Sequence, residues 1–350
     1  MTEQDKMVFC TLFDSNYLDK GLALYHSMRK NIAVFKLYIF AFDDRCFDVL
    51  GDMHLENVVL LSVKDIMTEQ LEQIQEERTR AEFCWTCTSL IIEHVLLICK
   101  EKVCTYIDAD IYFFANPINA IQKIIDNNCS VGVVEHRFEK NYKYGKAIFR
   151  NGKYCVQFNT FVNDHEGRRV LKEWKENCLN WCYARHEDGR YGDQKYLDKW
   201  TQKYSCVYEA EDLGVGVAPW NLHLYKYVGS EEDAIWMKRG NKKFPVVFYH
   251  FEGMRYLESN KVYLNLWAFD KQGTNRKVNL LYGKYFETVE DIRKKLKKTY
   301  GITFSHMIDV KSPYLGRDYS FYQFCLNDGF FEGLRAWLGY WKNGVFVLDK

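Results

Sequence analysis

Short apolar runs alternate with amphipathic segments along most of the chain. The apolar runs, which predict buried strands, occupy residues 8–12, 37–42, 58–61, 103–107, 130–135, 154–162, 205–210 and 246–251. Between them, apolar residues at helical spacing predict helices over residues 18–28, 69–100, 118–125, 164–183 and 193–200. The pattern therefore predicts an α/β fold, a single Rossmann-type, mostly parallel sheet flanked by helices, with its ligand at the carboxyl ends of the strands.

An Asp-x-Asp motif directly follows the run at residues 103–107. In extended chain this spacing points the carboxylates of Asp108 and Asp110 to one side. Two such groups are costly together unless a positive charge lies between them, and Mg²⁺ and Mn²⁺ both favour carboxylate oxygens. The motif predicts a metal clamp for a diphosphate, and the alternative is an ordinary solvated turn.

Composition narrows the class of protein. With 350 residues, 47% of them hydrophobic, the chain can form one large α/β domain and a smaller C-terminal unit. Lysine and arginine (48) nearly balance aspartate and glutamate (47). The chain therefore lacks the excess of positive charge that is typical of proteins that bind nucleic acid. The polar N-terminus and the break of the apolar stretch 90–99 by Glu93 and His94 predict a cytoplasmic protein without a membrane span. The absence of Gly-x-Gly-x-x-Gly and Walker motifs disfavours dinucleotide and P-loop enzymes.

Five short motifs follow one another in a recognisable order. They are residues 11–17 (TLFDSNY), 106–114 (YIDADIYFF), 157–163 (QFNTFVN), 192–194 (GDQ) and 249–255 (YHFEGMR). In this order they resemble the GT-A fold glycosyltransferases, and specifically the retaining family 8 type that includes bacterial lipopolysaccharide and polysaccharide sugar transferases. The resemblance covers residues 8 to 255.

The resemblance implies a role for each motif. Asp108, Asp110 and His250 would bind Mn²⁺ or Mg²⁺, and Asn159, Asp193 and Gln194 would lie beside the reacting sugar. The nucleotide of the donor, a uridine diphosphate sugar, would be bound by Thr11, Leu12, Asp14, Asn16, Tyr17, Arg80, Ala109, Gly253 and Arg255, with Asp14 and Asn16 on the uracil. Each residue also has a plainer interpretation: His250 as a core histidine, Asp193 and Gln194 as a helix turn, and Asp14 and Asn16 as turn formers.

Two positions depart from the family pattern. The family's usual arginine before the metal strand has no equivalent, because residues 85–89 read WTCTS. Arg78 and Arg80 lie about two helical turns earlier and could reach the phosphates only if the loop there is rebuilt. Arg255 replaces the family's lysine, and an arginine still binds phosphate.

The resemblance implies a metal-dependent glycosyltransferase that moves a sugar, with retention, to a glycan or lipid-linked saccharide acceptor. One alternative is a protein of the same fold that binds or hydrolyses nucleotide sugars without transfer. The other is an inverting enzyme, which needs a carboxylate base, and Glu135 at the end of its predicted strand is the candidate.

The remaining segments predict accessory parts. Residues 136–153 mix basic and aromatic side chains without periodicity. They are interpreted as a loop that binds the acceptor or closes over the site, and the alternative is a solvent-exposed loop without a role at the site. The predicted domains are a catalytic domain at 1–258 and an aromatic-rich helical appendage at 259–350, with an amphipathic basic helix over 288–300. The appendage is expected to cap the core, or to rest on the inner face of the membrane, where lipid-linked acceptors reside.

Overall fold

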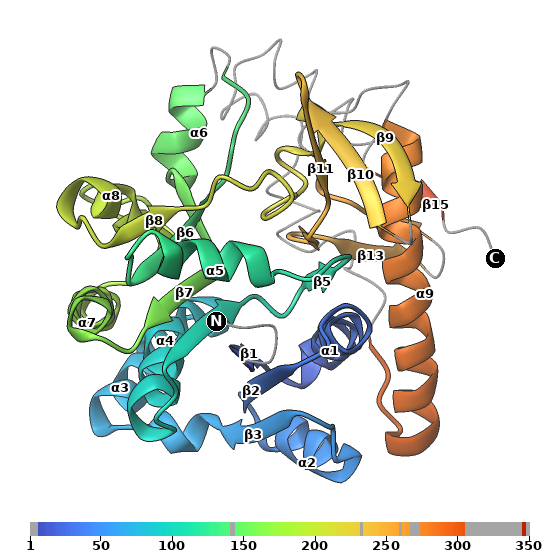
Figure 1. The fold of residues 1–350 in the computed structure, drawn as a ribbon. Coiled ribbons are helices and arrows are strands. Elements are labelled where there is room, and N and C mark those ends of the chain that lie inside the picture. The colour runs from blue at the N-terminus through green and yellow to red at the C-terminus, as the bar shows by residue number, and fades with distance from the viewer. Residues whose placement is uncertain are drawn as a thin grey trace.

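The computed structural model describes residues 6–140, 144–231, 234–258, 261–266, 274–304 and 345–347. A seven-stranded sheet forms its centre, in the order β3-β2-β1-β4-β7-β6-β8 (Figure 1). The strands are β1 Met7–Phe13, β2 Phe35–Ala41, β3 Val58–Ser62, β4 Val103–Ile107, β6 Val131–Glu135, β7 Tyr154–Val162 and β8 Val207–Glu209. All neighbours are parallel except β7, which runs antiparallel to both β4 and β6. The predicted α/β sheet is confirmed.

Helices cover both faces of this sheet because its strands are apolar on both sides. In β1, Met7, Phe9 and Phe13 enter one core cluster, and the alternate residues Val8, Cys10 and Leu12 enter the other. The first cluster packs against α1 Leu18–Asn31, α2 Asp44–Met53, α5 Ile118–Asp126 and α9 Thr274–Tyr300. The second packs against α3 Glu69–Glu77, α4 Arg80–Glu93 and α7 His165–Asn180.

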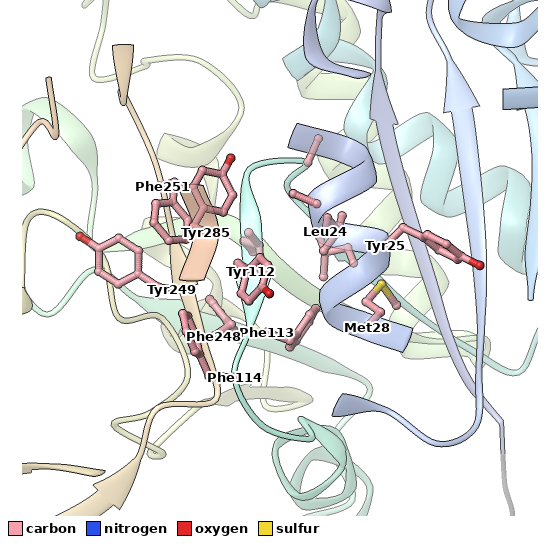
Figure 2. Close-up of a cluster of buried hydrophobic side chains, with 14 of the residues drawn as sticks. Leu24, Tyr25, Met28, Tyr112, Phe113, Phe114, Phe248, Tyr249, Phe251 and Tyr285 are labelled. Atoms are coloured by element: carbon pink, nitrogen blue, oxygen red, sulfur yellow. The ribbon is translucent and has the colours of Figure 1, made fainter. Parts of the chain in front are cut away.

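A two-stranded antiparallel ladder lies beside the central sheet. β5 Ile111–Phe113 pairs with β12 Phe248–His250, so that His250 lies opposite Ile111. Aromatic side chains of both strands gather with Tyr285 of α9 in one buried cluster beside α1 (Figure 2). The sequence prediction made the run 246–251 a strand of the main sheet, and this was wrong. It pairs instead with β5, the strand that directly follows the Asp-x-Asp motif.

Further elements lie outside the predicted pattern. A three-stranded antiparallel sheet is formed by β9 Lys226–Glu231, β10 Ala234–Arg239 and β11 Lys242–Pro245. A second one is formed by β13 Arg255–Glu258, β14 Lys261–Tyr263 and β15 Val345–Val347. Helix α6 Tyr144–Asn151 lies within residues 136–153, so the prediction of a loop there was wrong at these positions. A 3-10 turn at Gln194–Lys199 leads into the short α8 Trp200–Lys203.

The predicted helix over 69–100 is divided. Arg78 and Thr79 have extended backbone, and the Thr79 side chain caps α4 by accepting a hydrogen bond from the Glu82 amide. The segment Arg80–Ile98 is long and apolar enough to cross a membrane, but 56% of its apolar 18-residue stretch is buried inside the fold. Its residues Phe83, Cys87 and Ile91 form part of the second core cluster.

Helix α9 stands along the outer side of α1 (Figure 1). It contains the basic helix predicted at residues 288–300, but it begins earlier than predicted, at Thr274. Its residues Leu281, Tyr285 and Val289 belong to the same core cluster as β1. Residues 314–341, where the aromatic side chains of the predicted appendage are concentrated, lie outside the described residues, and the division at residue 258 stays a prediction.

Candidate metal centre and donor site

The two aspartates lie where β4 ends. The Asp108 amide donates to the Gln157 carbonyl of β7 (3.1 Å), and the Ile111 amide donates back to the Asp108 carbonyl (3.2 Å), which closes a tight turn. Tyr106, on β4, donates its hydroxyl to the Asp108 carboxylate (2.8 Å). The turn thus fixes Asp108 and Asp110 at the carboxyl edge of the sheet, as their spacing predicted.

His250 joins them through the pairing of β5 with β12. Its Nε2 lies 3.0 Å from Asp110 Oδ1 and 3.5 Å from Asp108 Oδ2. Among the described residues, this is the one trio of histidine, cysteine or acidic side chains whose ligand atoms all lie within 4.8 Å of one another. Its other ring nitrogen, Nδ1, lies 2.8 Å from Gln157 Oε1, and the Trp220 ring contacts its edge.

The three groups shift one another's pKa. Burial raises the pKa of Asp108 to about 6, although the nearby His250 charge opposes the rise. Burial would also raise the pKa of Asp110, but its contact with His250 outweighs this and lowers the pKa to about 2. Burial would lower the pKa of His250, yet the two carboxylates raise it well above the usual value. The site therefore favours a positive charge among its carboxylates.

These donors fit a hard divalent cation. Adjacent ligands of an octahedral ion at about 2.1 Å lie about 3 Å apart, close to the separations found here. Two carboxylates and one imidazole suit Mn²⁺ or Mg²⁺ and leave positions for the oxygens of a substrate. Asp108, Asp110 and His250 could therefore hold such an ion with little rearrangement.

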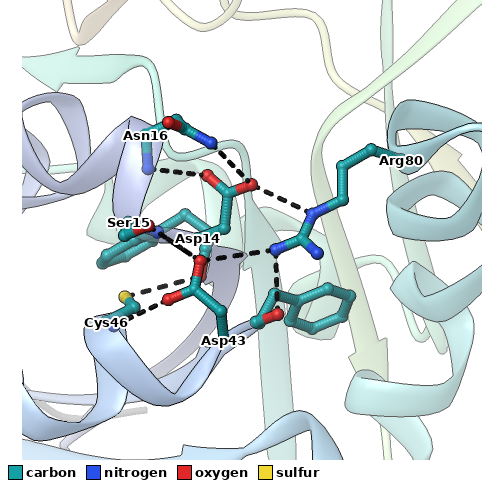
Figure 3. Close-up of polar contacts among 8 residues, drawn as sticks. Asp14, Ser15, Asn16, Asp43, Cys46 and Arg80 are labelled. Atoms are coloured by element: carbon teal, nitrogen blue, oxygen red, sulfur yellow. Dashed lines mark hydrogen bonds and ion pairs between the residues drawn. The ribbon is translucent and has the colours of Figure 1, made fainter. Parts of the chain in front are cut away.

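Asp14 and Asn16 follow the carboxyl end of β1, and Arg80 reaches them from the first residue of α4 (Figure 3). Asp14 accepts hydrogen bonds from the Asn16 amide (3.0 Å) and from Arg80 Nε (3.0 Å). Arg80 also donates to the Phe42 carbonyl (2.8 Å), whereas Arg78 is buried and donates to the carbonyls of Cys178 and Leu179. The structure thus brings Arg80, and not Arg78, beside Asp14.

Other predicted nucleotide residues differ in accessibility. Thr11, Leu12 and Ala109 are buried, and the Thr11 hydroxyl has no hydrogen-bond partner. Tyr17 is half-buried, with Lys20 Nζ 3.9 Å from its ring centre.

Gly253 and Arg255 follow β12. Gly253 has φ +67°, and a Cβ there would lie 2.2 Å from Asn265 Nδ2, so that only glycine fits this turn. The Arg255 backbone begins β13, and its side chain lies outside the described part of the structure.

The predicted sugar residues do not all point to one place. Asn159 lies opposite Tyr106 in the β4–β7 ladder, is fully buried, and has no partner for either amide atom. Asp193 is also buried, and burial together with the charge of Asp108 raises its pKa to about 8. Gln194 instead donates its side-chain amide to the Asn151 carbonyl at the end of α6. Asn159 and Asp193 thus lie near the acidic pair, and Gln194 is engaged by α6.

Glu135 ends β6 and lines a separate cleft of about 470 Å³. The cleft is bordered by Arg137, Phe138, Glu209 and Arg239. The next residue, His136, stacks on Phe138 and contacts Trp220, whose ring also contacts His250. A series of ring contacts therefore connects Phe138 of the cleft, through His136 and Trp220, to His250, and none of the three metal ligands lines the cleft.

Sequence reasoning missed Gln157 and Trp220 as parts of this centre. One signal for Gln157 was present: a glutamine and an asparagine interrupt an otherwise apolar buried strand, where an unpaired amide is costly. Nothing in the local sequence marks Trp220, which reaches the site from a loop.

The chain resembles two proteins of Bacillus subtilis (strain 168) in sequence. It is 29% identical to the uncharacterized protein YfnF over 262 residues, covering 73% of this chain and 84% of that protein. It is 24% identical to the uncharacterized protein YfnD over 264 residues, covering 75% and 82%. No protein-family model matches the chain.

A solved structure shares the fold. The crystal structure of an active-site mutant of LgtC, a galactosyltransferase, aligns over 79% of this chain and 96% of its own, with a TM-score of 0.52 at 13% identity. The central sheet with helices on its faces is the architecture predicted from the sequence. The chain therefore has the fold of the GT-A glycosyltransferases.

Proposed function

We propose that this protein is a metal-dependent glycosyltransferase whose donor is a nucleotide diphosphate sugar, with uracil as its base. The observation that carries the proposal is the convergence of Asp108, Asp110 and His250 at the carboxyl edge of a GT-A sheet. A divalent ion there would neutralise the charge that develops on the departing diphosphate. The contacts of Asp14 with Asn16 and Arg80 at the end of β1 support a base site at that position.

The chain's own residues would orient the sugar. Asn159 offers a buried amide whose donor and acceptor are both unpaired, and Asp193 offers a carboxyl group near Asp108. Such groups are costly to bury unless a ligand pairs with them. Sugar hydroxyls, which both donate and accept hydrogen bonds, are suitable partners, and their binding requires Asn159 to become accessible.

We propose retention of the anomeric configuration and a saccharide or lipid-linked glycan as acceptor. An inverting enzyme needs a carboxylate base at the acceptor hydroxyl. Glu135, the candidate from sequence, lines a cleft to which Asp108, Asp110 and His250 do not contribute, which favours retention. Location in the cytoplasm, and contact with the inner face of the membrane, stay predictions.

The first test is donor binding and turnover. Release of nucleoside diphosphate from a panel of nucleotide sugars is expected to require Mn²⁺ or Mg²⁺ and to rise when a saccharide acceptor is added. Asp110→Asn is expected to weaken Mn²⁺-dependent binding of uridine diphosphate at least about tenfold, because it removes a charged ligand. Asp291→Asn, an exposed position on α9, is the matched control.

The outcomes separate the alternatives. Nucleotide affinity that is equal with and without a chelator contradicts the metal assignment. Release of nucleotide that no acceptor stimulates favours a hydrolysing or binding protein. The anomeric proton coupling of the first product decides between retention and inversion, and under inversion Glu135→Gln should lower the rate about 100-fold or more.

A further inference from the structure

Gln157 connects the two parts of the metal centre. It is fully buried in β7, at a point where the β6–β7 register shifts between Gly132 and Val134. Its carbonyl oxygen accepts the Asp108 amide (3.1 Å), and its side-chain Oε1 lies 2.8 Å from His250 Nδ1. One residue therefore contacts both the Asp-x-Asp turn and the histidine that β12 brings to it.

The chemistry of this contact fixes the proton of the imidazole. A carbonyl oxygen can only accept, so the hydrogen must be on His250 Nδ1. In the neutral ring, Nε2 then carries the lone pair, and Nε2 is the atom that faces Asp110 and Asp108. The opposite amide orientation would donate to Nδ1, place the proton on Nε2 and prevent it from binding a cation.

The surroundings of Gln157 make this contact possible at a cost to the fold. The side-chain amide nitrogen of Gln157 is buried without a hydrogen-bond partner, and burying an unpaired donor lowers the stability of the fold. Gly216, with φ +88°, provides the space, because a Cβ there would lie 3.1 Å from Gln157 Nε2 and 2.6 Å from Val134 Cγ1. An apolar side chain at position 157 would avoid the unpaired amide, so the amide points to a role at the site.

We propose that Gln157 is a positioning residue that holds His250 in the tautomer with its lone pair on Nε2, and thereby sets the affinity of the Asp108–Asp110–His250 centre for Mn²⁺. The proposal rests on the metal centre of the proposed function. Groups that accept a hydrogen bond from a metal-binding histidine orient the ring and raise its basicity. The same chain position also orders Asp108 through the backbone, and a side-chain substitution leaves that hydrogen bond in place.

The experiment compares Gln157→Leu with Gln157→Glu. The leucine removes the acceptor at similar volume, whereas the glutamate keeps it. Mn²⁺ binding is measured by calorimetry without nucleotide, so the readout does not depend on activity. Gln157→Leu is expected to weaken Mn²⁺ affinity about 10- to 100-fold, and Gln157→Glu to stay within about threefold of the natural protein or bind more tightly.

Thr160→Val is the matched control. It removes a buried hydrogen bond from the same strand, between Thr160 and Thr105 (2.9 Å), without touching His250. It is expected to lower stability and leave Mn²⁺ affinity unchanged. Thermal unfolding without metal identifies variants that fail to fold, and if Gln157→Leu is one of them, Gln157→Met, which also lacks the acceptor, takes its place.

A second measurement observes the tautomer. The histidine ¹⁵N spectrum in saturating Mg²⁺ is expected to show a proton on Nδ1 of His250, and a proton on Nε2 would overturn the proposal. It is also overturned if Gln157→Leu binds Mn²⁺ normally while Asp110→Asn does not, or if Gln157→Glu or Thr160→Val loses as much affinity as Gln157→Leu. If the natural protein itself binds no Mn²⁺, the metal centre of the proposed function fails as well.

Discussion

Two histidines of equal burial both contact the Trp220 ring, and their surroundings shift their pKa values in opposite directions. His250 and His136 are each 4% exposed. His250 faces two carboxylates, which raise its pKa, whereas His136 stacks on Phe138, with ring centres 4.7 Å apart, and burial lowers its pKa to about 3. At the scale of the residue, neighbouring charge and not burial decides whether the ring becomes a cation.

His136 is expected to make the fold sensitive to acid. Its folded pKa lies below the usual 6.5, so only the unfolded chain takes up the proton as the pH falls through the range from 6.5 to 3. The contribution of neutral His136 to the free energy of unfolding is complete above pH 6.5. Below that pH, the free energy of unfolding falls by up to about 1.4 kcal/mol per pH unit. In His136→Phe the Lys153 carbonyl keeps its bond from the amide of residue 136. Urea unfolding from pH 7 to 4 should therefore depend less on pH in this variant, and an unchanged slope would contradict the assignment.

At the scale of the element, α6 is held by side chains from a distant turn. Lys195 donates to the Ile148 carbonyl (2.7 Å) and to Asp198 (2.7 Å), and Gln194 donates to the Asn151 carbonyl. The Ile148 carbonyl also accepts the Gly152 amide (2.8 Å), so Lys195 adds a second donor there. Gln194 pairs with a carbonyl of the last turn, where the helix supplies no amide donor of its own. The position of this eight-residue helix thus depends on the turn that also carries Asp193.

Lys195→Met is expected to loosen α6 while leaving the sheet intact. The variant removes two hydrogen bonds of a side chain that is 13% exposed, and local opening needs less free energy than global unfolding. Hydrogen exchange should become faster, by about tenfold or more for a bond of 1.4 kcal/mol, at amides 148–152. Lys172→Met on the exposed side of α7 is the control. Equal protection of α6 in both variants would show that the turn does not hold the helix.

At the scale of the whole molecule, α9 is joined to the N-terminal half by a buried ion pair. Arg293 contacts the Asp19 carboxylate through Nε (2.7 Å) and Nη2 (2.6 Å), and the Asp19 side chain is only 1% exposed. The aromatic cluster of β5, β12 and Tyr285 continues the same contact surface (Figure 2). Residues on both sides of position 258 therefore contribute to one core.

Arg293→Met is expected to destabilise the protein by about 3–5 kcal/mol, because it leaves Asp19 as a buried charge without its partner. The double variant Asp19→Leu/Arg293→Met should recover much of the loss, since replacing both partners removes that charge. Chemical unfolding of both, with Lys294→Met as an exposed control, provides the measurement. A loss below about 1 kcal/mol in the single variant would mean that this ion pair contributes little to the attachment of α9.

The sequence by itself determined the features that depend on neighbouring residues. The apolar runs at residues 8–12 and 154–162 predicted the buried strands β1 and β7, and the spacing of Asp108 and Asp110 predicted a paired acidic edge. Such features follow from local periodicity and sterics, so a short window of sequence is sufficient to recognise them. The family resemblance added His250, which no local pattern connects to the aspartates.

Only the tertiary structure decided which distant segments meet. The run containing His250 pairs with β5 and not with the central sheet, because β5 offers it a ladder partner directly after Asp110. The tertiary structure also decided the partners of two glutamines. Gln194 donates to a carbonyl of α6, and the side-chain amide of Gln157 contacts His250. Hydrogen bonds of this kind join residues far apart in the chain, and their partners are selected by the packing of the whole core, which a local sequence window does not contain.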